Sequence, residues 1–285
     1  MFDEPGLRYS HQAMRTTFTL FFPTDEPNTR LGIAEDCVSE IVDIELAISP
    51  YQEGSDVHRL NTSAGSGEWI RIGWPTYSLL QLCVQLMKQT NESFNPFNGR
   101  HTMRVSGKIL DSQTEGLLQE LSDHVSLANA VIEFSDTHPE CRLNRGTLID
   151  LGAIGKGWAL DKCKALIIDA GVERAFISAG GSSMIAIGTN WPVQIAGIDE
   201  SIRLCDQALS VSRRINSDAG GIHIVGENSL GPLDDIVSLV IGDSCAVTDA
   251  LSTGAAARGE VVNNSVHGYD VSTTIVSLTY TNPSQ

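Results

Sequence analysis

The sequence predicts an α+β fold in which mixed or antiparallel sheets are flanked by helices. Two long amphipathic helical patterns are separated by short β-rich runs, and a third helical pattern follows a glycine-rich turn near the middle of the chain. No internal repeat, low-complexity linker or charge block divides the 285 residues. A chain of this length forms one large domain or two intimately joined lobes, and we expect residues 1–285 to form a single domain.

The first third of the chain reads as a strand, a helix and a polar connection. Thr16 to Phe22 alternates and contains aromatic residues, which predicts a strand. Ser49 to Asn61 is polar and predicts a loop. Between them, Leu31 to Ile48 has helical spacing, and its predicted inner face consists of Ala34, Val38, Ile41, Val42, Glu45 and Leu46.

A second helix opens at Pro75 and ends at Thr90-Asn91, because proline favours the first helical turn and polar residues stop the apolar pattern. Its apolar positions are Leu79, Leu82, Cys83, Leu86 and Met87. The remaining short patterns predict a turn at Ser93 to Phe97, a helix at Thr114 to Leu121, and strands at Val131 to Phe134, Cys141 to Leu143, Arg174 to Ser178, Met184 to Ile187 and Val193 to Ile198.

The stretch from Thr147 to Ala170 combines three signals within a few residues. A β-rich segment, Thr147 to Leu151, leads into Gly152, Gly155 and Gly157, and a helical pattern follows. Free N–H groups and the helix dipole make such a helix start a site for anions, of which phosphate is the obvious one. The spacing fits neither the P-loop nor the dinucleotide fingerprint, so a tight turn without a ligand is the alternative. The helix places Ala159, Cys163, Leu166, Ile167 and Ala170 on one stripe and ends at Gly171.

The charge balance excludes two classes of partner. Acidic residues exceed basic ones by 16, which argues against binding to nucleic acid or to an anionic membrane surface. It also disfavours unaided binding of a polyphosphate, and a divalent cation would remove that conflict. The alternative is that the acidity only keeps the surface soluble.

The cysteines and the N-terminus point to a reducing compartment. The six cysteines are dispersed, with no Cys-x-x-Cys pair, which predicts reduced structural thiols. We find no signal peptide and no apolar run of about 20 residues, so we expect no membrane insertion. The sequence therefore predicts a cytoplasmic protein, unless a leader or lipobox precedes Met1.

A small-residue helix, expected from near Thr248 to Gly259, offers oxygen ligands. Asp249 and Thr253 are one helical turn apart, so both side chains lie on one face, and Ser252 lies beside them. Carboxylate and hydroxyl oxygens suit a hard cation. The alternative is that Asp249 merely caps the first turn of the helix.

Taken together, these motifs resemble the ApbE family of FAD:protein FMN transferases. The resemblance rests on DLGAIGKGWA from Asp150 to Ala159 with Asp161, on Ala179-Gly180-Gly181, and on DALST from Asp249 to Thr253. It extends to Met14 with Thr16-Thr17, to SPYQEGSDVHRLN from Ser49 to Asn61, and to Ser93-Phe94-Asn95-Pro96, so it covers nearly the whole chain.

The resemblance implies a flavin nucleotide site between two lobes and assigns residues to it. The FAD pocket would be formed by Met14, Tyr51, Ser93, Phe94, Asn95, Asp150, Lys156 and Ile224. Mg²⁺ would be held by the Asp249 and Thr253 side chains, by a carbonyl near Ala153, and by Ser252.

The implied reaction is attack by a threonine or serine hydroxyl of an acceptor flavoprotein subunit on the FMN-side phosphorus of FAD, with AMP leaving. His223 matches the family histidine and would act as the base.

The chain departs from the family after His223, where Val225 to Asn228 lack the usual Asp and Pro, and at Val211-Ser212-Arg213, which replaces Thr-Ser-Gly. Asn95 and Ser182 also replace aspartates. Two alternatives therefore stay open: an FAD pyrophosphatase that releases FMN and AMP, and a non-catalytic FAD-binding protein.

Overall fold

The computed structural model describes residues 4–99, 132–196, 198, 201–214, 235–259, 265–266 and 269–278. Its main feature is an eight-stranded sheet in the order β1-β2-β6-β7-β10-β11-β13-β12, in which all neighbours are antiparallel. The strands are β1 Gly6–Ala13, β2 Thr16–Pro23, β6 Ala175–Ala179, β7 Ser183–Ile187, β10 Ala208–Arg214, β11 Asp235–Gly242, β12 Ser265–Val266 and β13 Tyr269–Leu278.

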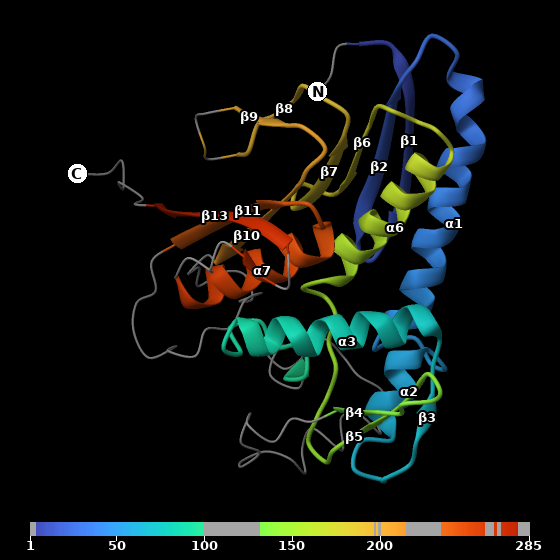
Figure 1. Ribbon diagram of the computed structural model, residues 1–285, viewed down its shortest axis with the longest axis vertical. Helices are drawn as coiled ribbons and strands as arrows, with labels where there is room; N and C mark the ends of the chain where they lie inside the picture. Colours follow the sequence, from blue (N-terminus) through green and yellow to red (C-terminus); the bar gives the residue numbers. More distant parts are fainter. Residues whose placement is uncertain are drawn as a thin grey trace.

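Three helices cover one face of this sheet (Figure 1): α1 Leu31–Ile48, α6 Gly155–Asp169 and α7 Cys245–Arg258. The opposite face packs a second apolar cluster that includes Met184, Trp191 and Val211. A short hairpin of β8 Trp191–Val193 and β9 Ile202–Leu204 contributes to that cluster. The sheet is therefore covered by helices on one side, and part of its other face packs against the separate β8–β9 hairpin.

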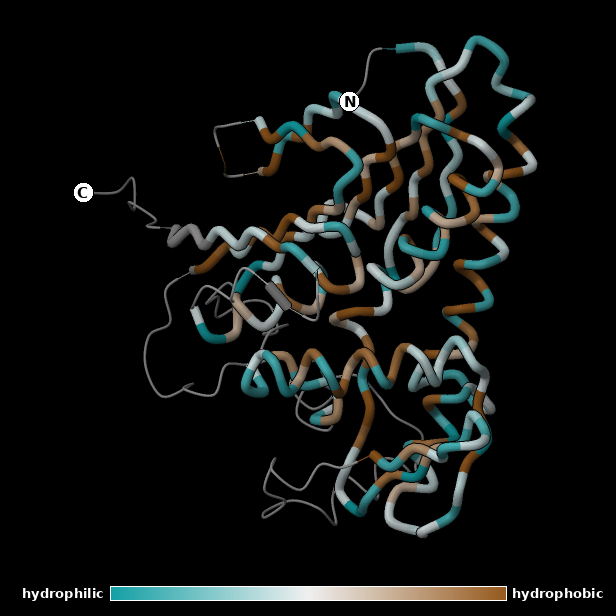
Figure 2. The backbone as a smooth tube through the Cα atoms, viewed as in Figure 1, coloured by the Kyte–Doolittle hydropathy of each residue, from teal (hydrophilic) through white to brown (hydrophobic). Residues whose placement is uncertain are grey.

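A smaller group of elements lies below α7 in Figure 1. It contains the sheet β3-β5-β4, with β3 Ile70–Arg71, β4 Ile132–Phe134 and β5 Glu140–Leu143, together with α2 Asp56–Thr62 and α3 Trp74–Gln89. A 3-10 turn, η1 Pro27–Arg30, precedes α1. One apolar cluster includes residues of both sheets, such as Phe18 and Leu143. Figure 2 shows this apolar content as brown segments along the strands and the inner turns of the helices. The predicted α+β class with antiparallel sheets and flanking helices is confirmed.

The two long helical patterns were predicted correctly. The first helix runs from Leu31 to Ile48, and the second includes Pro75 in its first turn and ends before Thr90. The predicted inner face of the first helix was partly wrong, because Leu46 is 51% exposed and the buried positions are instead Ala34, Cys37, Ile41, Ile44 and Ile48.

The prediction of a loop from Ser49 to Asn61 was wrong in its second half, which forms α2. The Ser55 hydroxyl accepts a hydrogen bond from His58 N at 2.9 Å, so it caps the helix. Val57 and Leu60 are fully buried. A polar composition thus conceals a short helix whose apolar residues are stabilised by tertiary packing.

Four local predictions also need correction. Thr147 to Leu151 is not a strand, since it makes only an isolated bridge between Leu148 and Asn98. The strand expected from Val193 to Ile198 is instead β8. Ala170 is exposed, although Gly171 adopts the left-handed conformation expected of it, with φ of 71°. α7 begins at Cys245 rather than near Thr248.

The helix expected from Thr114 to Leu121 lies outside the described residues. All six cysteines are free thiols, and five of them are buried. Within the described part of the chain, no helix is long and apolar enough to cross a membrane.

Candidate active site

The segment before the glycine turn is hydrogen-bonded to two other parts of the chain, which are α2 and the turn that contains Pro96. Buried Asn61, on α2, donates from Nδ2 to the Ile149 carbonyl at 3.0 Å and accepts from Ile149 N at 2.7 Å. Asp150 N donates to the Pro96 carbonyl at 2.8 Å. The backbone of Ile149 and Asp150 is therefore fixed where it enters the turn.

The glycine turn brings α6 against the start of α7. A Cβ on Gly157 would lie 2.2 Å from the Cys245 carbonyl oxygen, so only glycine fits there. The Gly157 N–H would bond the Ala153 carbonyl in a continuous helix, but it donates to Asp249 Oδ2 at 3.2 Å instead. Among the described residues, no group donates a hydrogen bond to the Ala153 carbonyl. The carbonyl that the family resemblance implies as a metal ligand therefore has no hydrogen-bond donor within the described ranges.

Asp249 lies in the body of α7 and is only 2% exposed. Its Oδ1 accepts from the Ser183 hydroxyl at 3.1 Å, and its Oδ2 faces the Lys156 ammonium at 3.6 Å. Burial raises the pKa of Asp249, while the charge of Lys156 and the hydrogen bonds from Gly157 and Ser183 lower it. The N-cap of α7 is Ser244, which accepts from Val247 N, so Asp249 is not a helix cap.

Hydroxyl groups cluster one turn further along α7. The Ser252 and Thr253 hydroxyls donate to the Asp249 carbonyl at 3.0 and 3.1 Å. The Ser212 hydroxyl, on β10, lies 2.8 Å from that of Ser252 and 3.2 Å from that of Thr253. The structure therefore places both predicted hydroxyl ligands on the helix that presents Asp249.

The N-terminus of α7 is fixed from α6 by Asp161. Its carboxylate accepts from the Ser244 hydroxyl at 2.6 Å, from Cys245 N at 2.7 Å and from Ala246 N at 2.9 Å. A negative charge at this position also complements the helix dipole. Asp161 thus sets how α7 meets the glycine turn.

The residues predicted to contact the flavin come from two turns beside this centre. Met14 and Arg15 form the β1–β2 turn with φ of 48° and 60°, and Met14 N donates to Glu45 Oε1 at 2.6 Å. Burial raises the pKa of the Tyr51 hydroxyl; the charge of Asp150 raises it further, and that of Arg15 lowers it. Tyr51, Asp150 and the Met14-Arg15 turn are therefore electrostatic neighbours.

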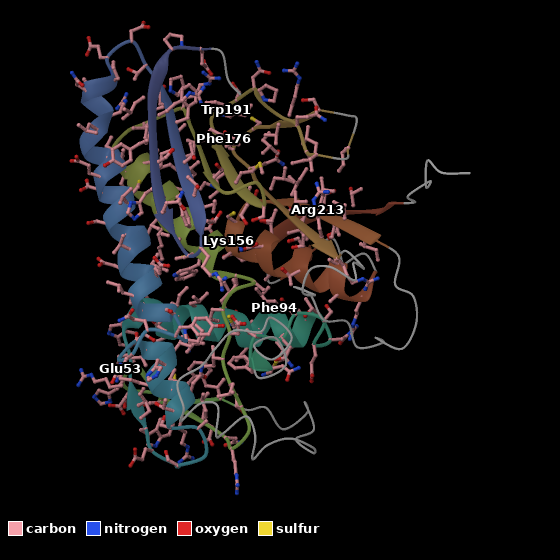
Figure 3. The ribbon with its side chains drawn as sticks, turned by 180° about the vertical axis from the view of Figure 1, so that it is seen from behind. Glu53, Phe94, Lys156, Phe176, Trp191 and Arg213 are labelled. Carbon is pink, nitrogen blue, oxygen red and sulfur yellow. The ribbon has the colours of Figure 1, made fainter. Side chains whose placement is uncertain are left out.

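The turn from Ser93 to Asn95 packs against α7. A Cβ on Gly254 would lie 3.0 Å from Ser93 Oγ and 3.2 Å from Phe94 N. Figure 3 shows Lys156 beside one end of α7 and Phe94 on the α3 side of that helix. Asn95 Oδ1 accepts from Phe97 N at 3.0 Å, whereas its buried Nδ2 has no partner in the described structure. A buried amide without a partner is costly, and a ligand oxygen would satisfy it.

The structure thus unites most of the residues that the sequence proposed for the site. His223 and Ile224 lie outside the described residues. Sequence reasoning gave no role to Asn61, Ser183 or Ser212, although each lies within or beside a quoted motif. In the described ranges, no three His, Cys, Asp or Glu side chains gather as a metal site. A cation here would be bound by one carboxylate and neutral oxygens, which fits a hard ion such as Mg²⁺.

Comparisons with known proteins identify relatives of this chain. A curated relative, the FAD:protein FMN transferase of Rhodobacter capsulatus, is 27% identical over 224 residues. That match covers 72% of this chain but only 42% of the relative, so the chain spans less than half the length of that protein.

Solved structures share the fold. The ApbE protein of Thermotoga maritima has a TM-score of 0.69 at 22% identity and covers 88% of this chain and 86% of its own. The flavinyl transferase ApbE of Pseudomonas stutzeri has a TM-score of 0.74 at 15% identity and covers 96% and 97%. The sequence profile described as "ApbE family" matches residues 14–266, and the chain therefore belongs to the ApbE family.

Proposed function

We propose that this chain is a Mg²⁺-dependent FAD:protein FMN transferase and that residues 1–285 act as a single domain. It attaches FMN through a phosphoester to a threonine or serine of an acceptor flavoprotein subunit and releases AMP. Family membership supports this function. The observation that supports it most directly is the Asp249 carboxylate, which is buried against the glycine turn and accepts a hydrogen bond from Gly157 N there.

FAD would lie along the strip of residues from Tyr51 to α7. Tyr51 and Met14 would contact the flavin, and the Asn95 amide would meet a ligand oxygen. Asp150 and Lys156 would flank the nucleotide at the glycine turn. Lys156 is the described cation nearest to Asp249, and its ammonium group would turn from that carboxylate toward a phosphate oxygen.

Ala153, Asp249, Ser252 and Thr253 would hold the metal through oxygen atoms. When bound, Mg²⁺ would neutralise pyrophosphate oxygens and stabilise the negative charge that develops on them during the transfer. In a protein with a net charge of −16, this neutralisation is needed for a dianionic ligand to stay bound.

In the proposed reaction, the acceptor hydroxyl oxygen forms a bond to the FMN-side phosphorus. The bond from that phosphorus to the bridging oxygen breaks, and AMP leaves with this oxygen. The hydroxyl proton passes to a base, for which we propose His223. The residues of the site orient FAD for this displacement, which is mainly a task of positioning and electrostatics.

The function is tested by incubating the protein with FAD, Mg²⁺ and a threonine-containing acceptor protein. AMP release that requires the acceptor, together with covalent flavin fluorescence on the acceptor in a denaturing gel, is the expected result. AMP release without the acceptor would identify a pyrophosphatase instead. FAD binding without any AMP release would identify a binding protein. A matched reaction with EDTA in place of Mg²⁺ should give neither product.

A further inference from the structure

The hydroxyl of Ser183 contacts the proposed metal ligand from the sheet. Ser183 is the first residue of β7, and its hydroxyl donates to Oδ1 of Asp249 at 3.1 Å. The other carboxylate oxygen, Oδ2, accepts from Gly157 N at 3.2 Å and lies 3.6 Å from the ammonium nitrogen of Lys156. The two oxygens of this carboxylate are therefore held by different parts of the fold, one by the sheet and one by the glycine turn.

The backbone of Ser183 is fixed by both neighbouring strands. It pairs with Ala179 of β6 on one side and with Ser210 of β10 on the other. Because side chains alternate along a strand, Ser183 faces α7, whereas Met184 packs into the apolar cluster on the opposite face of the sheet. Ser183 is fully buried, so its hydroxyl cannot exchange Asp249 for bulk water.

This donor decides which oxygen of Asp249 a cation can use. Withdrawing Oδ1 from Ser183 would leave a buried hydroxyl without a partner, which is costly. Oδ2 lies at the glycine turn, where the phosphates of FAD would bind. Mg²⁺ requires near-octahedral geometry, whereas the larger Ca²⁺ takes more ligands and often binds both oxygens of one carboxylate. A carboxylate that offers one oxygen therefore suits Mg²⁺ better than Ca²⁺.

Ser210 is a natural comparison for Ser183. The two serines lie directly opposite each other on adjacent strands, and both are fully buried. The Ser210 hydroxyl lies 2.8 Å from Oγ1 of Thr248, the residue before Asp249. Both serines thus join the sheet to α7, but only Ser183 contacts the carboxylate. An effect of packing alone would be common to both serines, whereas an effect on the metal would belong to Ser183.

We propose that Ser183 is a positioning residue for the metal: it holds Oδ1, so that Asp249 offers only Oδ2 to the cation, and this favours Mg²⁺ over Ca²⁺. Hydrogen bonds of this kind orient metal-binding carboxylates, and the loss of one typically lowers metal affinity about 10- to 100-fold. The inference rests on the proposed transferase function, because that function makes Asp249 the ligand of Mg²⁺.

The proposal is tested by following FAD fluorescence while Mg²⁺ or Ca²⁺ is added to the whole protein without an acceptor. Half-maximal FAD binding by the wild type should need less Mg²⁺ than Ca²⁺. Ser183→Ala should raise the required Mg²⁺ concentration about 10- to 100-fold. It should raise the required Ca²⁺ concentration less, because the released carboxylate can offer both oxygens. Ser183→Thr, which keeps the hydroxyl, should retain the preference for Mg²⁺.

Ser210→Ala is the matched control, since it removes a buried hydroxyl of the same kind. It should lower the melting temperature, as Ser183→Ala should, but leave both metal concentrations unchanged. The proposal is overturned if Ser183→Ala keeps the wild-type dependence on Mg²⁺, or if Ser210→Ala shifts that dependence equally. A wild type that uses Ca²⁺ as readily as Mg²⁺ would also overturn it, and this measurement needs no variant to fold.

The same titrations separate this proposal from the transferase function. FAD binding by the wild type that does not depend on Mg²⁺ would overturn both. Transfer is scored separately with FAD, Mg²⁺ and the acceptor protein. A shift in Mg²⁺ dependence in Ser183→Ala, together with no AMP release by the wild type, supports the positioning role and contradicts the transferase.

Discussion

The ammonium nitrogen of Lys156 lies 3.6 Å from Oδ2 of Asp249. Lys156 belongs to the first turn of α6 and Asp249 to the second turn of α7, so this pair joins the glycine turn to the helix that presents the proposed metal ligands. The carboxylate is buried, and a protein cation already faces it. If FAD and Mg²⁺ bind as proposed, Asp249 would hold the metal, and Lys156 would pair with a phosphate oxygen instead of with this carboxylate.

The first prediction concerns the two hydrogen bonds between the Asn61 side chain and the buried backbone of Ile149. Asn61→Ala should lower the free energy of unfolding by roughly 2–4 kcal/mol, because it leaves a buried N–H and a buried carbonyl without partners. Urea denaturation measures this change. Gln81→Ala, at an exposed position of α3, is the control and should change the stability by less than about 0.5 kcal/mol. An Asn61→Ala variant as stable as this control would show that the two Asn61–Ile149 hydrogen bonds do not stabilise the fold.

The second prediction concerns the contact between α6 and α7. Gly157→Ala should destabilise the protein by about 1–3 kcal/mol, because the new Cβ would lie 2.2 Å from the Cys245 carbonyl oxygen. It should also weaken FAD binding, since the Gly157 N–H orients Asp249. Gly32→Ala is the matched control: nothing lies within 4 Å of a Cβ there, and alanine favours the helix. Thermal denaturation and flavin fluorescence titration measure both effects, and equal results for the two variants would rule out the close contact.

The third prediction is a pH dependence of stability. Burial raises the pKa of Asp161, and the hydrogen bonds from Ser244, Ala246 and Cys245 only partly oppose this effect. The folded protein therefore binds more protons than the unfolded chain above pH ~4, the usual range of an aspartate. The contribution of Asp161 to the free energy of unfolding should fall as the pH rises from there through the raised pKa, and then stay constant.

Urea denaturation of wild type and Asp161→Asn across this range measures the difference. The advantage of the wild type over the variant should be largest at the acidic end and should shrink as the pH rises. A difference that grows with pH would show that the hydrogen bonds at the start of α7 outweigh burial.

The fourth prediction concerns ligand selectivity. With Mg²⁺ present, FAD should bind more than about tenfold more tightly than riboflavin, because Lys156 and the proposed metal contact only the pyrophosphate. Titration calorimetry compares the two ligands directly. Equal affinities would mean that the glycine turn does not bind the phosphates.

The sequence predicted the elements whose information is local. The helices from Leu31 and from Pro75 were predicted because apolar residues repeat at helical spacing over four or more turns. The start of α7 was missed by about one turn. Its N-terminus is fixed by Asp161, which is 84 residues from Cys245, and no local pattern reveals such a contact.

The same limit applies to the site. That Asp249 and Thr253 lie on one face of α7 could be predicted from their spacing, and their role as metal ligands stays a prediction. The supporting groups could not, because Ser183 is 66 residues from Asp249 and Asn61 is 88 residues from Ile149. α2 was hidden for a different reason: its polar sequence is stabilised by the burial of Val57 and Leu60, which only the tertiary fold provides.

The central claim, that Asp249 holds Mg²⁺ against the FAD pyrophosphate, is tested most directly by FAD titration of Asp249→Asn in the presence and absence of Mg²⁺. Asp243→Asn, an equal charge change at an exposed position just before α7, is the control. We predict that Asp249→Asn weakens Mg²⁺-dependent FAD binding by about 1–3 kcal/mol, or about 5- to 150-fold, with little change in the ligand-free melting temperature, and that it abolishes AMP release. An Asp249→Asn variant with the FAD affinity, Mg²⁺ dependence and AMP yield of the wild type would contradict the claim.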